Sequence, residues 1–548
     1  MKTVSTIVAI CFPLLVTAQH VSVNGQVRDK NGDSLPLANI ILLPDSVSAA
    51  TDTDGYFSLS ATTGPKQFII SYTGYQSIQR TIFLKNDTTI NFPMEQKIDQ
   101  LKEVVIRSNR FSQADWIETT RSSTNTLTPQ EISAIPVLGG EADVIKVMQL
   151  LPGTVRGIEG SSDLFVRGGA ADQNLVLLDD APIYNTSHLF GFLSVFNPDV
   201  LENVESITGG FPAQYGGRLS SILNIETISD VPNRTHASAN IGLLASRLFI
   251  EQPLVKDKAS IWLTGRRTYI DQVVKLVNEE LPYFFYDLNG KIIIKPGARD
   301  NIQLGFYGGQ DVLDIFRDRN NDGDGFLTSY QSGNNSQMLK WERTFRSDWT
   351  SRLSFIRTEY KYEILNKFED NRSVSSSDIE DIGVKFLAQK IFPGKSSVTF
   401  GADWTQHQVS PSVFSVSGTF AEIFESSSSA ARQAQEVSLH GQYEWSLSSR
   451  WMLNTGFRAS MAFVQNKTYA IPEPRISARY KMGKNEALKF SYSRMAQYMH
   501  RISNSAVTSP TDIWYPVTDS IRPQTSHQVS IAWQRLFGAK KIFVSVES

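Results

Sequence analysis

The side chains whose types and spacing best suit metal binding lie in one acidic stretch, residues 318–325. Oxygen-bearing side chains recur there at every second position, and Gly323 allows a sharp turn. This spacing resembles the start of a calcium-binding loop, although Ser329 stands where such a loop normally has a bidentate glutamate. The stretch fits either a structural calcium site or a solvated, turn-rich loop. The calcium ligands would be Asp318, Asn320, Asp322 and Asp324.

No group of residues in the sequence matches a familiar catalytic arrangement. The seven histidines include no His-Glu-x-x-His zinc pair, and neither a Gly-x-Ser-x-Gly elbow nor a Walker loop occurs. We therefore expect no enzyme activity and no cofactor other than the structural calcium. The net charge of -2 also lacks the basic field that nucleic-acid binding requires, so we expect no nucleic-acid partner.

The first 18 residues have the organisation of a secretory signal peptide. Lys2 is followed by an apolar segment, residues 4–16, and by small residues that end at Ala18. The alternative is a buried N-terminal strand or helix. No later stretch approaches 18 consecutive apolar residues, so we expect an exported chain without a transmembrane helix.

Two modules are expected between the signal peptide and residue 121. Residues 20–95 contain six or seven short alternating segments separated by turns such as 29–32 and 51–55, which is typical of a β-sandwich. Residues 96–121 are polar and predict a linker. Its one β-prone segment is suited to strand addition to another protein. That segment is Leu101, Lys102, Glu103, Val104, Val105 and Ile106.

Residues 122–228 predict a mixed α/β domain rich in glycine turns. Residues 129–135 and 141–151 have helical patterns, and short apolar strands separated by glycines follow them.

Apolar and polar residues alternate from residue 229 to residue 548. Leu439, Tyr443 and Trp445, for example, alternate with polar neighbours before a turn at 447–450. Strands of about ten residues with one apolar face match membrane-spanning strands of a β-barrel. The alternative is a soluble stack of antiparallel hairpins. Seven short turns, near residues 256, 297, 347, 394, 448, 484 and 539, predict about 14 strands. Long polar loops are expected at 309–337, 360–380, 405–435 and 494–525.

The order of these modules, together with three motifs, resembles a TonB-dependent outer-membrane receptor of the Bacteroidetes type. Residues 25–57 are similar to the carboxypeptidase-regulatory-like domain, and residues 101–106 are similar to the TonB box. Residues 122–228 carry the family's plug motifs, Arg-Gly, Leu-Asp-x-x-Pro and Tyr-Gly…Asn-Ile. The matching residues are Arg167, Gly168, Gly169, Asp179, Pro182, Tyr215, Gly216, Gly217 and Asn224.

The resemblance implies a mainly β protein in the outer membrane of a Gram-negative bacterium. It would import a scarce ligand, such as a siderophore, oligosaccharide or peptide, with energy from TonB, ExbB and ExbD. A surface lipoprotein is a further expected partner beside the outer-membrane lipid. A passive pore or a surface adhesion protein on the same barrel is the alternative. Because the family's barrels have 22 strands, we expect the chain to be truncated at its C-terminus.

Two departures from the family's pattern bear on the substrate. Asp180 stands where the family usually has glycine, and the alanine-rich segment typical of glycan transporters is absent before Tyr215. Five cationic residues are expected to face the barrel lumen, where they would attract an anionic ligand or, as we favour, pair with plug acids such as Glu202 or Glu205. These cations are Arg458, Arg475, Arg479, Lys489 and Arg494.

Overall fold

The computed structural model describes most of the chain. The described residues are 20–30, 32–72, 75–95, 113–135, 141–157, 163–191, 193–242, 244–269, 271–272, 282–318, 325–345, 348–394, 396–503, 512–538 and 542–548. The expected signal peptide, residues 1–18, lies outside them. The chain divides into two compact units, residues 1–104 and 105–548, and each is described by itself.

The first unit is a β-sandwich, as predicted. One sheet contains β1 (His20–Asp29), β4 (Tyr56–Thr62), β7 (Thr88–Thr89) and β8 (Phe92–Met94). The other has the order β3 (Val47–Ala50), β2 (Asn39–Leu43), β5 (Gly64–Ser71) and β6 (Ile78–Leu84). Alternate side chains of both sheets, among them Val23, Ile40 and Phe68, point inward and form one apolar core.

The second unit contains a mixed α/β domain, which we call the plug. Its five-stranded sheet has the order β13 (Ala181–Pro182), β12 (Asn174–Leu178), β15 (Ser221–Thr227), β14 (Leu201–Ile207) and β9 (Thr124–Leu127). Shorter strands are β10 (Thr154–Arg156) and β11 (Leu164–Val166). The helices are α1 (Gln113–Glu118), α2 (Pro129–Ala134) and α3 (Val144–Met148), with 3-10 turns η2 (Ala171–Gln173), η3 (Leu189–Gly191) and η4 (Pro198–Val200).

Both helices predicted in the plug are present, although they are shorter than expected. A capping box begins α2, because the Thr128 side chain accepts from the backbone N–H of Glu131 and the Glu131 carboxylate accepts from the backbone of Thr128. Asp143 caps α3 in a similar way by accepting from the backbone of Lys146. The buried face of α3, with Val144 and Val147, packs into the core of the plug sheet.

A sheet of 16 strands forms the remainder of the second unit. Its first strands are β16 (His236–Ile241), β17 (Ala245–Val255), β18 (Ala259–Thr268), β19 (Tyr283–Gly297), β20 (Asp300–Asp318) and β21 (Gly325–Thr344). β22 (Trp349–Phe368), β23 (Asn371–Ile391), β24 (Ser397–Ser417), β25 (Ser427–Ser428), β26 (Arg432–Ser446) and β27 (Trp451–Val464) follow. The last are β28 (Lys467–Gly483), β29 (Glu486–Gln497), β32 (Gln524–Phe537) and β33 (Ile542–Glu547). The short turn η5 (Gly418–Glu422) and the hairpin β30 (Met499–Ile502) and β31 (Ile513–Pro516) lie between them.

The antiparallel barrel sheet is confirmed, but two expectations about it were wrong. The count of about 14 strands missed β16 and the two-residue β25, because neither follows one of the seven short turns. The long loops were also misjudged, since β20 to β24 continue through much of 309–337, 360–380 and 405–435 and reach 19 to 21 residues. Ladder hydrogen bonds sustain these extensions, in which charged and apolar side chains are mixed.

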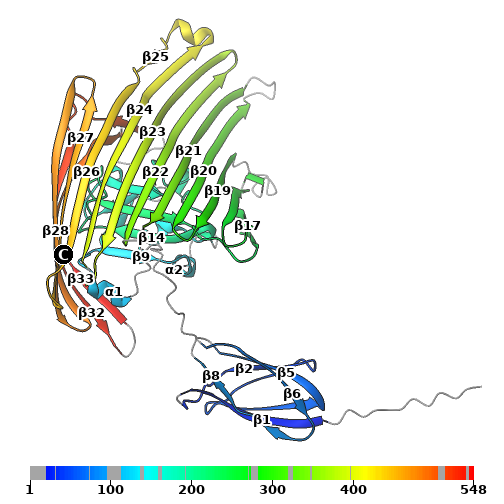
Figure 1. Ribbon diagram of the computed structural model, residues 1–548. Coiled ribbons are helices and arrows are strands. Elements are labelled where there is room, and N and C mark those ends of the chain that lie inside the picture. The colour runs from blue at the N-terminus through cyan, green and yellow to red at the C-terminus, as the bar shows by residue number, and fades with distance from the viewer. Residues whose placement is uncertain are drawn as a thin grey trace, which may run out of the picture. The chain divides into compact units, whose positions relative to one another are not determined.

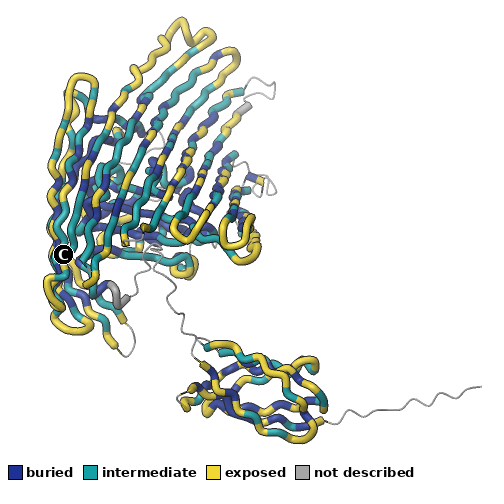
Figure 2. Tube along the Cα trace, in the orientation of Figure 1, coloured by how far each residue is buried: buried dark blue, intermediate teal, exposed yellow. Residues whose placement is uncertain are grey.

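Outward-facing side chains form an apolar band around the barrel sheet. Figure 2 shows exposed and buried positions alternating along its strands. Leu439 and Phe457 are 58% and 50% exposed, as expected for side chains that face lipid. On β22 the outward row changes from Phe355 to Arg357 and Glu359, and Arg357 pairs with a carboxylate of β23. The apolar band therefore ends near this point, and the long strands continue beyond it.

None of the described helices is long and apolar enough to cross a membrane. In Figure 1 the plug elements β9, β14 and α2 lie on the inner side of the barrel sheet. Inward-facing barrel side chains contact the plug at many points, and these contacts define the candidate site.

Candidate functional site

A plug segment that follows β13, residues 182–191, is attached to the inner wall of the barrel; we call it the docking segment. Thr358 of β22 donates to the carbonyl oxygen of Pro182 at 2.9 Å. The Asn334 side chain of β21 donates to the carbonyl oxygen of Asn185 at 2.8 Å. The Tyr184 hydroxyl donates to the carboxylate of Asp381 on β23. Three neighbouring barrel strands thus hold one short loop of the plug.

His188 provides the most strongly charged contact of the docking segment. Its Nε2 lies 3.0 Å from Asp287 and its Nδ1 lies 3.2 Å from Asp311, while the ring stacks on Phe285 with centroids 3.5 Å apart. Burial alone would lower the pKa of His188, but the two carboxylates raise the pKa to about 9. His188 is therefore protonated at neutral pH and carries a positive charge between two barrel carboxylates.

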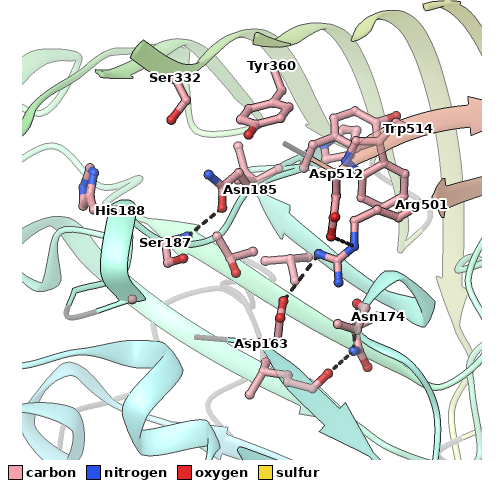
Figure 3. A pocket seen from close by; sticks show the side chains of 18 of the residues that line it. Asp163, Asn174, Asn185, Ser187, His188, Ser332, Tyr360, Arg501, Asp512 and Trp514 are labelled. Atoms are coloured by element: carbon pink, nitrogen blue, oxygen red, sulfur yellow. Dashed lines mark hydrogen bonds and ion pairs between the residues drawn. The ribbon is translucent and has the colours of Figure 1, made fainter. Parts of the chain in front are cut away.

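The docking segment forms one wall of a pocket with a volume of about 110 Å³. Tyr184 of the plug packs edge-on against Trp514 at a centroid distance of 4.9 Å. Tyr330 and Tyr360 line the opposite side from the barrel strands. Figure 3 shows the lining as a mixture of aromatic rings with amide and hydroxyl groups.

One ion-pair chain crosses the floor of this pocket. Arg501 of β30 lies 3.4 Å from Asp163 of the plug and 3.5 Å from Asp512, which precedes β31 (Figure 3). These contacts hold the β30–β31 hairpin against the plug. The pocket is thereby assembled from plug, barrel wall and hairpin together, so a ligand bound there would contact all three.

The first plug motif forms a tight turn near the end of the barrel sheet. Arg167 and Gly168 have positive φ values of 50° and 80°. The Arg167 guanidinium donates to Ser123 at 2.8 Å and pairs with Glu547 of β33 at 3.1 Å. A Cβ at Gly169 would come within 2.5 Å of the Cβ of Ser220. None of these three motif residues lines the pocket, so their contacts are structural.

The second motif places two carboxylates against three barrel strands, β19, β21 and β22. The Asp179 carboxylate lies 3.0 Å from Lys291 and accepts from the hydroxyl of Thr227 at 2.6 Å. The Asp180 carboxylate lies 3.0 Å from Lys340 and 3.7 Å from Arg352. Pro182 begins the docking segment directly after this turn. We call Asp179, Asp180, Lys291, Lys340 and Arg352 the acidic-turn contacts.

The acidic-turn contacts favour ionised carboxylates. Burial alone would raise the pKa of Asp179, but Lys291, Lys340 and Thr227 hold it below its usual range. The pKa of Asp180 is lowered for the same reason, against a similar effect of burial. Asp180 has φ +74°, a backbone conformation that glycine adopts without strain. Here the ionic contacts offset the backbone strain of a residue with a side chain.

The third motif brings the chain back toward the barrel wall. Gly217 has φ +80°, and a Cβ at Gly216 would come within 3.0 Å of the Arg458 guanidinium carbon. Tyr215 packs against the small apolar cluster around Ile207 and Phe211. Asn224 is buried in β15, between Leu177 and Glu205 of the neighbouring strands.

Two sequence-based site predictions lie wholly or largely outside the described residues. The TonB-box segment, Leu101 to Ile106, is outside them. Of the calcium ligands, Asn320, Asp322 and Asp324 are outside, and Asp318 is described only by its backbone pairing with Gly325. Both assignments stay predictions.

Arg479 pairs with a plug acid as expected, Glu118 at 3.6 Å, but the other described contacts of these cations differ from the expected pairs with Glu202 or Glu205. Arg458 pairs with Asp403 at 2.9 Å and donates to the carbonyl oxygen of Gln214, while Arg475 donates to that of Pro212. Lys489 donates to two backbone carbonyls of residues 116–121. Glu205 instead pairs with Arg121, which belongs to the plug side. Partners of this kind cannot be predicted from a sequence, because every residue has a main-chain carbonyl.

The sequence analysis singled out Pro182 but no later residue of the docking segment. His188 meets Asp287 and Asp311, which are 99 and 123 positions away. A lone histidine after a polar turn gives no indication of such distant partners. Aspartates at inward positions of barrel strands were the available signal, because a buried carboxylate requires a cationic partner.

Comparisons with known proteins agree with this architecture. The family model described as CarboxypepD_reg-like domain matches residues 23–106. TonB-dependent Receptor Plug Domain matches residues 116–221. The family model described as TonB dependent receptor-like, beta-barrel matches residues 283–547.

Two curated relatives are each 26% identical to the chain over part of their length. TonB-dependent receptor SusC of Bacteroides thetaiotaomicron matches over 226 residues, which is 37% of this chain and 20% of that protein. Vitamin B12 transporter BtuB of Vibrio vulnificus matches over 160 residues, 28% of this chain and 25% of that protein. The matches thus span a quarter or less of either relative.

Solved structures with the same fold include two receptors of different ligands. The siderophore receptor PirA from Acinetobacter baumannii has a TM-score of 0.57 at 14% identity, covering 80% of this chain and 71% of that one. Copper transporter OprC has a TM-score of 0.56 at 13% identity, and the match covers 76% of this chain and 69% of that one. At such identities the likeness establishes the fold, and the ligands of these proteins do not transfer.

Proposed function

Because the chain belongs to the TonB-dependent receptors of the Gram-negative outer membrane, we propose that it imports a scarce ligand with energy delivered through TonB. The observation that carries this proposal is the plug held inside the barrel sheet. Ionic contacts from β19, β21 and β22 meet a single plug turn, and the docking segment adds His188. Work is required to move a plug that is held by so many contacts. A passive pore has no need of a plug that must be moved.

The coupling segment in this proposal is residues 101–106, directly before the plug. Strand addition by TonB would connect its backbone to a partner driven by ExbB and ExbD in the inner membrane. Force applied there would act first on α1, whose Glu118 pairs with Lys481 of the barrel, and the pull would have to break this contact. The regulatory-like sandwich and a surface lipoprotein are proposed accessory parts. The proposal includes no enzyme activity, no nucleic-acid partner and no cofactor other than calcium at Asp318 to Asp324.

The ligand in this proposal contacts the pocket lined by the docking segment. The pocket opens between plug and barrel wall, and its volume admits one functional group of a larger molecule. Siderophore, oligosaccharide and peptide all remain candidate classes. The domain limits that we propose are 20–95 for the sandwich, 96–121 for the linker, 122–228 for the plug and 229–548 for the barrel.

Capture by TonB tests this proposal directly. The purified chain should be retained by an immobilised periplasmic domain of TonB, and deleting residues 101–106 should abolish retention. Deleting residues 107–112 shortens the linker equally and serves as the matched control. A passive pore or adhesion protein predicts no retention in any of the three proteins, and that result would refute the energised mechanism.

A further inference from the structure

Arg218, at the end of the third plug motif, is a buried cation that lacks an acidic partner in the described part of the chain. Its side chain is only 8% exposed. Nη1 donates to the carbonyl oxygen of Gly217 at 2.8 Å, and Nε is buried without any partner. Among the described residues no carboxylate oxygen lies within 4.0 Å of the guanidinium. Burying a charge in this way is costly unless something neutralises it.

The guanidinium lines the pocket next to the docking segment. It lies over the ring of Trp514 at 5.1 Å, and Trp514 in turn packs against Tyr184. The negative face of the indole compensates part of the charge and fixes the guanidinium at the pocket wall. An aromatic ring cannot replace a full counter-ion, so a positive charge remains at the pocket wall.

The other two described cations that line the pocket each have carboxylate partners. Arg501 has Asp163 and Asp512 as partners, at 3.4 Å and 3.5 Å. His188 lies between Asp287 and Asp311. Among the described lining residues Arg218 is therefore the cation without a carboxylate within 4.0 Å, and its planar guanidinium is suited to an oxyanion.

We infer that the pocket binds its ligand through an anionic group, a carboxylate or a phosphate, that pairs with Arg218 against Trp514. This inference rests on the proposed import function and names the chemistry of its ligand. The pocket volume of about 110 Å³ suits one such group with a small apolar neighbour, and the walls of Tyr330 and Tyr360 would contact that neighbour.

Thermal unfolding of the purified full chain in detergent tests the inference with three probes. Benzoate and inorganic phosphate represent the two anions, and neutral benzamide has the shape of benzoate without its charge. The wild type should be stabilised by at least one anion and not by benzamide. The preferred anion identifies the group as a carboxylate or a phosphate.

Variants of the guanidinium sharpen the test. Arg218→Gln should raise the unfolding midpoint without ligand, since it removes an uncompensated charge, and should weaken anion binding by roughly tenfold or more. Arg218→Lys keeps the charge but not the planar fork, and should bind the anion with intermediate affinity. Arg450→Gln, an exposed position in a turn, is the matched control and should behave as wild type.

Three results would overturn the inference: neither anion stabilises the wild type, benzamide stabilises it equally, or Arg218→Gln responds to anions as the wild type does. A poorly folding Arg218→Gln leaves the wild-type probes and Arg218→Lys decisive. A chain that binds TonB but ignores both anions contradicts only this inference. A chain that binds benzoate through Arg218 but not TonB contradicts the import proposal instead.

Discussion

Removing the charge of Asp180 should release the plug turn that carries the acidic-turn contacts. Asp180→Asn keeps the size of the side chain, and asparagine tolerates the positive φ of 74° as well as aspartate does. The substitution leaves Lys340, whose side chain is 5% exposed, without its counter-ion at 3.0 Å. Arg352 is 30% exposed and 3.7 Å away, so it contributes less.

The expected cost follows from leaving a buried charge unpaired, about 3–5 kcal/mol. One tenfold change in an equilibrium corresponds to about 1.4 kcal/mol, so local opening of the turn should become more frequent by roughly two to three and a half orders of magnitude. Hydrogen exchange of backbone amides in β12 and β13 measures this opening. Exchange in the outer barrel strands should stay unchanged.

Two further variants separate charge from other effects. Asp300→Asn breaks an exposed pair with Arg343 at 3.2 Å and should cost only about 0.2–1 kcal/mol. Asp180→Asn combined with Lys340→Met removes both charges and should recover most of the protection. Equal exchange in wild type and Asp180→Asn, or no recovery in the double variant, would refute the assigned role of these contacts.

Three further perturbations have defined outcomes. Since the pKa of His188 is raised from 6.5 to about 9, its stabilising charge is complete below pH 6.5 and is lost as the pH rises through about 9. The unfolding midpoint of the wild type should therefore fall across that range more steeply than that of His188→Gln, and parallel curves would exclude this role. Gly169→Ala brings a methyl group onto Ser220 and should cost about 1–3 kcal/mol by thermal unfolding, whereas Gly308→Ala meets no atom within 4 Å and should be nearly neutral. Leu439→Arg places a charge in the apolar band and should cost about 2–4 kcal/mol. Its folded fraction on unheated gels should fall below that of Glu359→Lys, which lies beyond the band.

The fold was largely predictable because its signals are local. Seven short turns of the barrel were recognised, since each separates two segments with a period of two, whereas the two-residue turns at 369–370 and 465–466 were not. The α2 capping residues Thr128 and Glu131 lie three positions apart and indicate a helix start directly. The length of β20 to β24 was not predictable, because polar strands beyond the lipid lose the apolar alternation on which the prediction depended.

The candidate site was much less predictable because its partners are far apart in sequence. Asp180 was recognised as a departure from the family's glycine, but Lys340 and Arg352 are contributed by strands more than 150 positions later. Arg218 directly follows the Tyr-Gly motif but was not singled out, and its lack of a carboxylate partner among the described residues is visible only in the structure. Charge pairing across the plug–barrel boundary depends on sheet register, which composition does not encode.

The most direct test of the account asks whether the proton gradient moves the plug. Ser122 is fully buried at the plug–barrel boundary, with its hydroxyl 3.2 Å from those of Ser491 and Ser530. Ser122→Cys in a Cys11→Ser background therefore gives a thiol that a maleimide reagent reaches only when the plug shifts. The account predicts labelling in energised cells that is lost after a protonophore or after deletion of residues 101–106. Labelling of equal extent under all three conditions would contradict it.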